Sequence, residues 1–204
     1  MKPGRPRAFD LDAAIDKAML IFWEKGYDGT TLNDLTDAFG IQRGSFYKAF
    51  GSKEALFERA LARYQETVAA YTIDALEQPT AIKVITETWR SAADASTGPD
   101  TPNGCLIVQA ALGVTPDSSS AHDELTRIRN EHRARLMSRF DRAVSEGDLP
   151  SDTNTGALAD YVVAVQWGIS VRARTGGTRE EVQEMVEFAL SRLQAPALAS
   201  NLNA

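Results

Sequence analysis

The sequence predicts an all-α protein, and three observations lead to that prediction. Apolar residues recur every three or four positions through most of the 204-residue chain, as on one face of an amphipathic helix. Glycine, proline and short polar runs separate these periodic segments, as expected of loops between helices. No apolar run reaches the roughly eighteen residues that a transmembrane helix needs, so we expect no membrane-spanning segment.

The first predicted helix covers residues 10–26. Asp10 can cap its first turn by accepting a backbone N–H, and Gly26 can end it because glycine tolerates a positive φ angle. The apolar stripe of this helix consists of Ala14, Ala18, Ile21 and Phe22. We expect it to pack behind the elements that follow.

Residues 31–53 predict two short helices, a tight break between them and the start of a third helix. Thr31 can cap the first short helix and Gly40 can end it. The second short helix covers residues 42–48. Two short helices joined in this way are typical of a helix-turn-helix, whose second helix lies in the major groove of DNA.

The residues around this motif resemble the TetR family of bacterial transcriptional regulators over residues 10–60. The matching positions are Ile21-Phe22, Lys25-Gly26-Tyr27, Thr30-Thr31, Gly44-Ser45-Phe46-Tyr47, Phe50, Ser52-Lys53-Glu54 and Leu56. Family members more often carry Leu, Ser or Thr, and His at the places of Ile21, Gln42 and Lys48. These differences leave the operator sequence open, whereas the resemblance implies DNA binding by residues 1–51.

Several side chains near the second short helix are candidates for DNA contacts. Gln42, Arg43 and Ser45 lie in its first turns, from which arginine can pair with guanine and glutamine with adenine. Gly44 would let the helix backbone approach the duplex closely. The resemblance implies phosphate contacts by Thr31, Tyr47, Lys48 and Lys53. The alternative for Tyr47 is packing beside Phe46.

Charge is distributed unevenly along the chain. Residues 1–60 hold nine basic and nine acidic side chains, whereas residues 61–204 carry the whole net charge of −6. A neutral module with clustered bases suits site-specific DNA binding, and the acidic remainder should point away from DNA. Within the basic arm of residues 1–8, Arg5 and Arg7 can enter the minor groove, or the arm can be a solvated tail.

The rest of the chain is predicted to be helical as well. A long helix should run from Ser52 to about Leu76 and would connect the two domains rigidly. Further helices are expected around residues 82–89, at 105–113 and at 121–146, with loops at 96–104 and 114–120. The short apolar segment 105–113 could be a buried helix or a strand, and its helical surroundings favour a helix.

The last two predicted helices cover residues 155–174 and 178–194. The first of them is apolar on more than one face and must therefore be buried on more than one side. Residues 146–181 also resemble the C-terminal part of TetR regulators, in which this helix pair forms a four-helix dimer interface. The resemblance implies a homodimer with these interface candidates: Leu158, Val162, Val165, Trp167, Ile169, Val182, Val186 and Phe188. The tail at 196–204 should be flexible.

The C-terminal domain, residues 52–195, is expected to bind an unidentified small-molecule effector. The candidate ligand-binding residues are Trp89, Cys105, Leu106, Gln109 and Phe140. Cys105 is the single cysteine, which fits a reducing cytoplasm and excludes an internal disulfide. It could be an inert buried thiol or, as in some TetR regulators with a similar Gly-Cys-Leu stretch, a sensor of electrophiles or oxidants.

Two other function classes fit the sequence less well. An enzyme is not expected, because the chain has no glycine-rich phosphate loop, no nucleophile elbow and no Cys/His pair at a useful spacing. No metal or cofactor is expected, since His122 and His132 lack metal-ligand spacing. A helical interaction module that does not bind DNA would leave the polar and basic residues at 42–48 unexplained. The sequence therefore predicts a cytoplasmic regulator that binds a palindromic operator, as a repressor released by its effector or as an activator.

Overall fold

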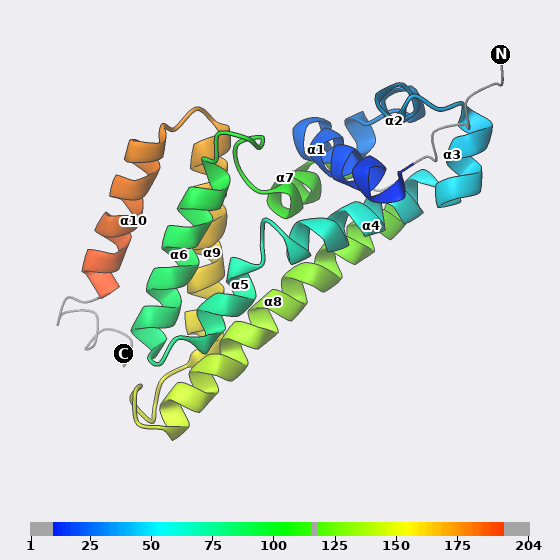
Figure 1. Cartoon of the computed structure of the whole chain (residues 1–204). Coiled ribbons are helices and arrows are strands. Elements are labelled where there is room, and N and C mark those ends of the chain that lie inside the picture. The colour runs from blue at the N-terminus through cyan, green and yellow to red at the C-terminus, as the bar shows by residue number, and fades with distance from the viewer. Residues whose placement is uncertain (1–9, 116–117, 194–204) are drawn as a thin grey trace, which may run out of the picture.

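The computed structural model describes residues 10–115 and 118–193, apart from the side chain of Ser119, and this part of the chain contains helices and no strand. The elements are α1 (Leu11–Gly29), α2 (Leu32–Phe39), α3 (Arg43–Phe50), α4 (Lys53–Glu66), α5 (Tyr71–Asp74), the short 3-10 helix η1 (Ala75–Glu77), α6 (Ala81–Ser96), α7 (Leu106–Gly113), α8 (Ser119–Ser145), α9 (Thr155–Arg174) and α10 (Arg179–Leu193). Figure 1 shows α1 to α4 at one end of the molecule and α6, α9 and α10 at the other. The all-α prediction is confirmed for the described residues.

The N-terminal helices pack around an aromatic core. Phe22 and Trp23 of α1 are fully buried, and they meet Phe57 and Tyr64 of α4 edge-on at ring-centroid distances of 4.9 and 5.0 Å. Such edge-to-face pairs add about 0.5–1.5 kcal/mol beyond the burial of their area. Because α4 supplies half of these rings, it belongs to the same core as α1, although we predicted a domain boundary at residue 51.

The predicted helix ends at Thr31 and Gly40 are confirmed. The Thr31 hydroxyl accepts the Asp34 N–H at 3.1 Å and caps α2. Gly40 ends α2 in the left-handed conformation, with φ of 67°. At Gly26 the helical geometry of α1 is broken, with φ of 72° and ψ of 171°, and one further turn extends to Gly29. That turn leads the chain into the helix-turn-helix.

The long helix predicted from Ser52 to about Leu76 was wrong in its length. Ser52 caps α4 as expected, but α4 ends at Glu66 and two short helical pieces follow. The Thr67 hydroxyl donates to the Arg63 carbonyl at 2.6 Å, and the Ala69 N–H reaches back to the Tyr64 carbonyl. A threonine hydroxyl that bonds the preceding turn offers the backbone an alternative to regular helix. The two ends of the molecule are therefore not connected by one continuous helix, because the helix is interrupted after Glu66.

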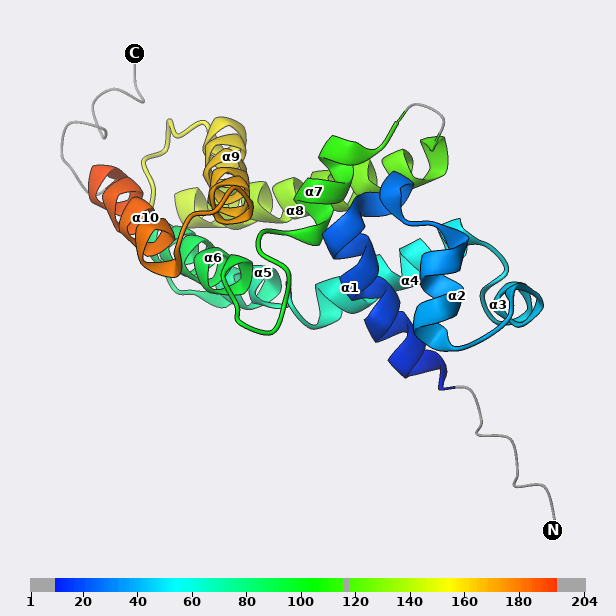
Figure 2. The ribbon, with the colours of Figure 1, turned by 90° about the horizontal axis from the view of Figure 1, so that it is seen from above.

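Helix α7 confirms the helical interpretation of residues 105–113. Cys105 occupies the N-cap position of α7 and makes no side-chain cap hydrogen bond. Leu106 and Ala110 of α7 are completely buried in the same cluster as α1 and α4. Figure 2 shows α7 lying between α1 and the C-terminal helices, so α7 joins the two parts of the molecule.

A second core unites α6, α8, α9 and α10. Trp89 is fully buried and donates its indole N–H to the Val162 carbonyl at 3.0 Å, and Phe140 lies in the same cluster. Helix α8 contributes to both cores, with Leu125 and Ile128 in the first and Leu136 and Phe140 in the second. None of the described helices is long and apolar enough to span a bilayer.

Candidate DNA-binding surface and effector cavity

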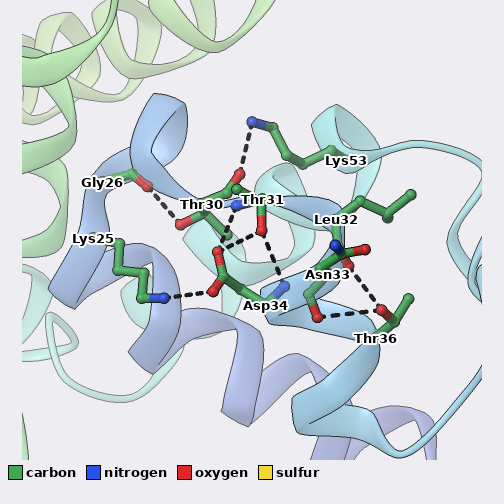
Figure 3. A network of polar contacts seen from close by, with 9 residues as sticks. All are labelled: Lys25, Gly26, Thr30, Thr31, Leu32, Asn33, Asp34, Thr36 and Lys53. Atoms are coloured by element: carbon green, nitrogen blue, oxygen red, sulfur yellow. Dashed lines mark hydrogen bonds and ion pairs between the residues drawn. The ribbon is translucent and has the colours of Figure 1, made fainter.

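A polar network fixes the start of α2 beside the end of α1 (Figure 3). The Lys25 ammonium lies 2.5 Å from the Asp34 carboxylate, which also accepts the Thr31 N–H at 2.8 Å. The Lys25 hydrogen bond, followed by those from Thr31, holds the pKa of the Asp34 carboxyl well below its usual range. Asp34 therefore stays ionised and keeps α2 in place at neutral pH.

Helix α3 has one buried face and one exposed face. Phe46 and Phe50 are buried in the N-terminal core. The predicted DNA-contacting residues of this region are all exposed: Gln42, Arg43, Gly44, Ser45, Tyr47 and Lys48. Tyr47 keeps 53% of its surface exposed although its ring meets Phe46 edge-on. The core packing that we considered for Tyr47 therefore occupies only part of the side chain.

Two features of α3 suit a close approach to a duplex. A Cβ added at Gly44 would meet no heavy atom within 4 Å, so packing within the chain does not require glycine there. Arg43 donates from Nη2 to Oδ1 of Asn33 at 2.8 Å. That contact holds the guanidinium from a neighbouring helix, and Asn33 was missed by sequence reasoning because nothing in the sequence pairs it with Arg43.

The structure places Lys53 differently from the other candidates. Its ammonium donates to the carbonyls of Tyr27 and Thr30 at 3.0 and 3.1 Å and lies 4.1 Å from the centroid of the Tyr27 ring. Cations are favoured beside the carbonyls that end a helix. Lys53 therefore holds the end of α1 against the start of α4. Two other predicted DNA contacts, Arg5 and Arg7, lie outside the described residues.

A cavity of about 60 Å³ lies among α4 to α9 in the C-terminal part. That volume is enough for about four water molecules or a small ligand. Apolar wall residues come from α7, α8 and α9 and include Ile107, Val108, Ile128 and Val163. Of the five predicted ligand-binding residues, Cys105 alone lines this cavity.

The other four ligand candidates lie elsewhere. Trp89, Leu106 and Phe140 are fully buried in the two cores and do not line the cavity. Gln109 donates from Nε2 to the Asn103 carbonyl at 2.8 Å and holds the α6–α7 loop. The prediction had no means of separating core residues from cavity-wall residues, so these four do not line the cavity.

A chain of polar side chains crosses the cavity wall. Nε2 of His132 lies 2.8 Å from the amide oxygen of Gln166, whose amide nitrogen donates to the Tyr71 hydroxyl at 3.1 Å. Burial lowers the pKa of His132 and raises that of Tyr71. Both side chains are therefore neutral at pH 7. These hydrogen bonds were not predicted from the sequence, because the three residues come from three separate helices.

Cys105 is half-buried in the cavity wall beside Tyr64. Burial raises the pKa of the thiol above its ordinary value, and the hydrogen bond from Tyr64 opposes this effect only in part. A thiol is far less nucleophilic than a thiolate. The environment of Cys105 therefore favours the inert interpretation over the sensor.

Two family models together match most of the chain. One, described as bacterial regulatory proteins of the tetR family, matches residues 14–60, and the other, a tetracyclin repressor-like C-terminal domain, matches residues 80–192. The chain belongs to the TetR family. This membership confirms the resemblance of the N-terminal motif and the prediction of a regulator rather than an enzyme.

Three relatives illustrate the similarity. The HTH-type transcriptional repressor ComR of Escherichia coli (strain K12) is 32% identical over 185 residues, covering 89% of this chain and 88% of ComR. A cysteine-substituted form of the TetR family regulator CifR, solved with 26-base-pair operator DNA, is 41% identical with a TM-score of 0.86, covering 92% of this chain and 98% of that one. A putative TetR regulator from Rhodococcus sp. RHA1 is 37% identical with a TM-score of 0.61, covering 88% and 96%.

The predicted dimer residues of this TetR protein divide into two groups. Val162, Ile169, Val182 and Val186 are buried in the chain's own core, so a partner cannot reach them and their assignment to the interface was wrong. Leu158 and Val165 are half-buried, and Trp167 and Phe188 are exposed. The prediction chose apolar residues from the two helices without considering which side of the helix each one faces.

One side of α9 carries exposed apolar residues that the selection missed. Tyr161 and Val171 are 44% and 41% exposed, and Ala164 and Gly168 lie between them on the same face. The spacing of these four positions alternates between three and four residues, which is that of a helix–helix seam. Their alignment could have been found in the sequence by separating two apolar faces of α9.

Two sets of contacts join α1 to the C-terminal helices. The Asp28 carboxylate accepts the Thr115 N–H at 2.6 Å and the Ser118 hydroxyl at 2.5 Å, in the segment that connects α7 and α8. Arg174 at the end of α9 donates to the Glu24 side chain and backbone at 3.0 and 2.9 Å. Both contacts span more than eighty residues of sequence, and local patterns do not predict them.

Proposed function

We propose that the chain is a homodimeric repressor that binds a two-fold symmetric operator and releases it when a small molecule fills the cavity. The observation that carries DNA recognition is the exposed polar face of α3, backed by buried Phe46 and Phe50. Support for repression comes from ComR, a repressor by name, and support for operator binding from CifR, which was solved with operator DNA. As the chromosome of a bacterium lies in the cytoplasm, we place the protein there.

In the proposed complex, α3 lies in the major groove. Arg43 and Gln42 read base edges, Ser45 contributes a shorter contact, and Gly44 faces the groove. Tyr47, Lys48 and Thr31 are assigned to phosphates, since they flank the α3 face and remain exposed. We assign Lys53 a supporting role, because its ammonium donates to the carbonyls that end α1.

For the dimer we propose a corrected interface. It consists of the α9 seam (Tyr161, Ala164, Gly168 and Val171) together with Trp167 and Phe188. Phe188 keeps 61% of its surface exposed in the single chain, an unusual exposure for a large aromatic side chain. Small residues such as Ala164 and Gly168 would allow the α9 helices of two copies to approach closely.

For release we propose that α7 transmits the occupancy of the cavity. Cys105, Ile107 and Val108 line the cavity, while Leu106 and Ala110 of the same helix are buried against α1 and α4. A ligand that displaces α7 must therefore repack the core that supports α2 and α3. The separation of the two α3 helices in the dimer would then no longer match the half-sites, which lie about 34 Å apart or a multiple of that distance.

The test is binding to the DNA upstream of the protein's own gene, followed by fluorescence anisotropy with a scrambled duplex as control. We expect one dimer per duplex and preference for the upstream DNA by at least about a thousandfold, as for other specific DNA-binding proteins. Equal affinity for both duplexes would contradict the proposal. A monomer bound to a single half-site would contradict its two-fold symmetry.

A further inference from the structure

The cavity contains a buried hydroxyl with unused hydrogen-bonding capacity. Ser170 of α9 lines the cavity and is only 2% exposed. Its Oγ has no hydrogen-bond partner among the described residues. Leaving such a group without a hydrogen bond is unfavourable, so a hydrogen-bond partner from outside the chain would be stabilising there.

A second hydroxyl in the same wall can also donate. The Tyr71 oxygen accepts a hydrogen bond from the Gln166 amide at 3.1 Å, and no hydrogen bond donated by the Tyr71 hydroxyl is found among the described residues. Burial raises the pKa of Tyr71, so the phenol keeps that proton. Ser170 and Tyr71 therefore present two O–H donors to whatever fills the cavity.

The charged groups of the cavity wall all have the same sign. Arg129 and Arg135 are the only permanently charged residues that line it, and no aspartate or glutamate does so among the described residues. Arg129 bonds the Thr126 hydroxyl at 2.8 Å and lies 5.9 Å from the centroid of the Trp167 ring. A cationic ligand would meet repulsion here and find no counter-charge, whereas oxygen acceptors would be attracted.

We propose that the cavity binds a small molecule with an apolar body and a hydrogen-bond-accepting oxygen, either a carbonyl or a carboxylate, and that it excludes amines. The oxygen would accept from Ser170 and Tyr71, and the body would pack on Ile107, Ile128 and Val163. This inference rests on the proposed function, since it takes the cavity as the effector site. It adds the chemical class of the effector.

The experiment compares three probes that share one ring: acetophenone, benzoate and benzylamine. Isothermal titration calorimetry of the full chain without DNA measures binding alone. We expect acetophenone or benzoate to bind at least tenfold more tightly than benzylamine. If benzylamine binds as tightly as the better of these two, or if neither of them binds, the inference is overturned.

Two variants test the residues of the cavity wall, one for the shared hydrogen-bond donor and one for the difference between a carbonyl and a carboxylate ligand. Ser170→Ala removes one donor and should weaken the better-binding probe by about 2- to 10-fold. Arg129→Gln should weaken benzoate and leave acetophenone unchanged, while Arg127→Gln is the matched control because Arg127 pairs with Glu124 and Glu131 outside the cavity. Circular dichroism checks that Ser170→Ala is folded. Full affinity of the folded variant for both oxygen-bearing probes would overturn the inference.

Operator binding distinguishes this inference from the proposed function. If an oxygen-bearing probe binds the free protein but leaves the operator complex intact, the ligand class stands and effector release fails. If benzylamine alone binds and releases the operator, release stands and the ligand class fails.

Discussion

At the scale of single residues, Arg43 and Lys48 should make different contributions to DNA binding. Arg43→Ala should relax specificity at one base pair in each half-site, at a cost of about 1–3 kcal/mol, because a two-bond contact to guanine is lost. Lys48→Ala should weaken binding to every sequence alike and lower the salt slope by about one unit. Affinities for a set of single-base operator variants at several salt concentrations measure both effects. Identical profiles for the two variants would show that the roles are wrongly assigned.

Lys53 allows a separate test, because its ammonium already has two partners within the chain. Lys53→Met keeps the aliphatic stem and removes both hydrogen bonds, so it should lower the free energy of unfolding by about 1–3 kcal/mol. Urea unfolding measures this loss, and Lys48→Met is the matched control from an exposed site. If Lys53→Met keeps full stability but binds DNA poorly, Lys53 acts mainly on phosphate.

Cys105 provides a third prediction at this scale. Because burial raises the pKa of its thiol, little thiolate exists at pH 7, and a quinone should modify Cys105 more slowly than it modifies a free cysteine. Modification should speed up as the pH rises toward the thiol pKa. Cys105→Ser should still release the operator when the effector is added. Loss of release in Cys105→Ser, with operator binding intact, would favour the sensor instead.

At the scale of helices, the seam on α9 makes a testable prediction about assembly. Ala164→Asp places a charge at the centre of the seam without removing any packed side chain, since Ala164 is exposed. Burying two unpaired carboxylates across a two-fold axis is unfavourable, so the variant should be monomeric and bind the operator poorly. Sedimentation velocity measures the assembly, and Ala134→Asp on an exposed face of α8 is the control. A dimeric Ala164→Asp protein would place the interface elsewhere.

The sequence predicted helices better than it predicted their roles. Caps and glycines identify the ends of α2 because their hydrogen bonds are local, as at Thr31 and Gly40. The break after Glu66 was missed, because threonine is common in intact helices and its bond to Arg63 has no distinct signature. The two faces of α9 were not separated, because both are apolar and only tertiary packing decides which one the chain itself covers.

The candidate DNA surface was also easier to predict than the cavity. Residues 42–48 form one short helix, so their spacing alone places them together. The wall groups Tyr71, His132 and Gln166 come from α5, α8 and α9, and their meeting depends on how three helices cross. A single sequence does not show how helices cross, which is why four of the five ligand candidates do not line this cavity.

At the scale of the whole molecule, Asp28 should couple the effector cavity to the DNA-binding end. Asp28→Asn weakens the bonds to Thr115 and Ser118 that tie α1 to the α7–α8 connection. The affinity of the free protein for effector should stay the same. The coupling free energy between effector and operator, typically about 1–3 kcal/mol, should become smaller. Operator titrations with and without ligand measure the change, with Asp123→Asn as control. Unchanged coupling would show that this contact does not transmit the signal.

Asp28 also gives this coupling a pH dependence. The hydrogen bond from Ser118 lowers the pKa of the carboxyl, so the bond stabilises the fold above the unfolded-state pKa of about 4 and is lost as pH falls through the folded-state value. The contact should therefore be fully present throughout the neutral range.

The path of α8 through both hydrophobic cores has a consequence for how the chain unfolds. Leu125 and Ile128 near one end and Leu136 and Phe140 farther along anchor a single helix in two places. If one core unfolds, the other loses the α8 residues that pack in it, so thermal unfolding of the chain should be a single cooperative transition. In hydrogen–deuterium exchange, amides at both ends of α8 should then share one opening free energy, and a fragment ending at Glu66 should aggregate through the apolar surface that α7 and α8 normally cover.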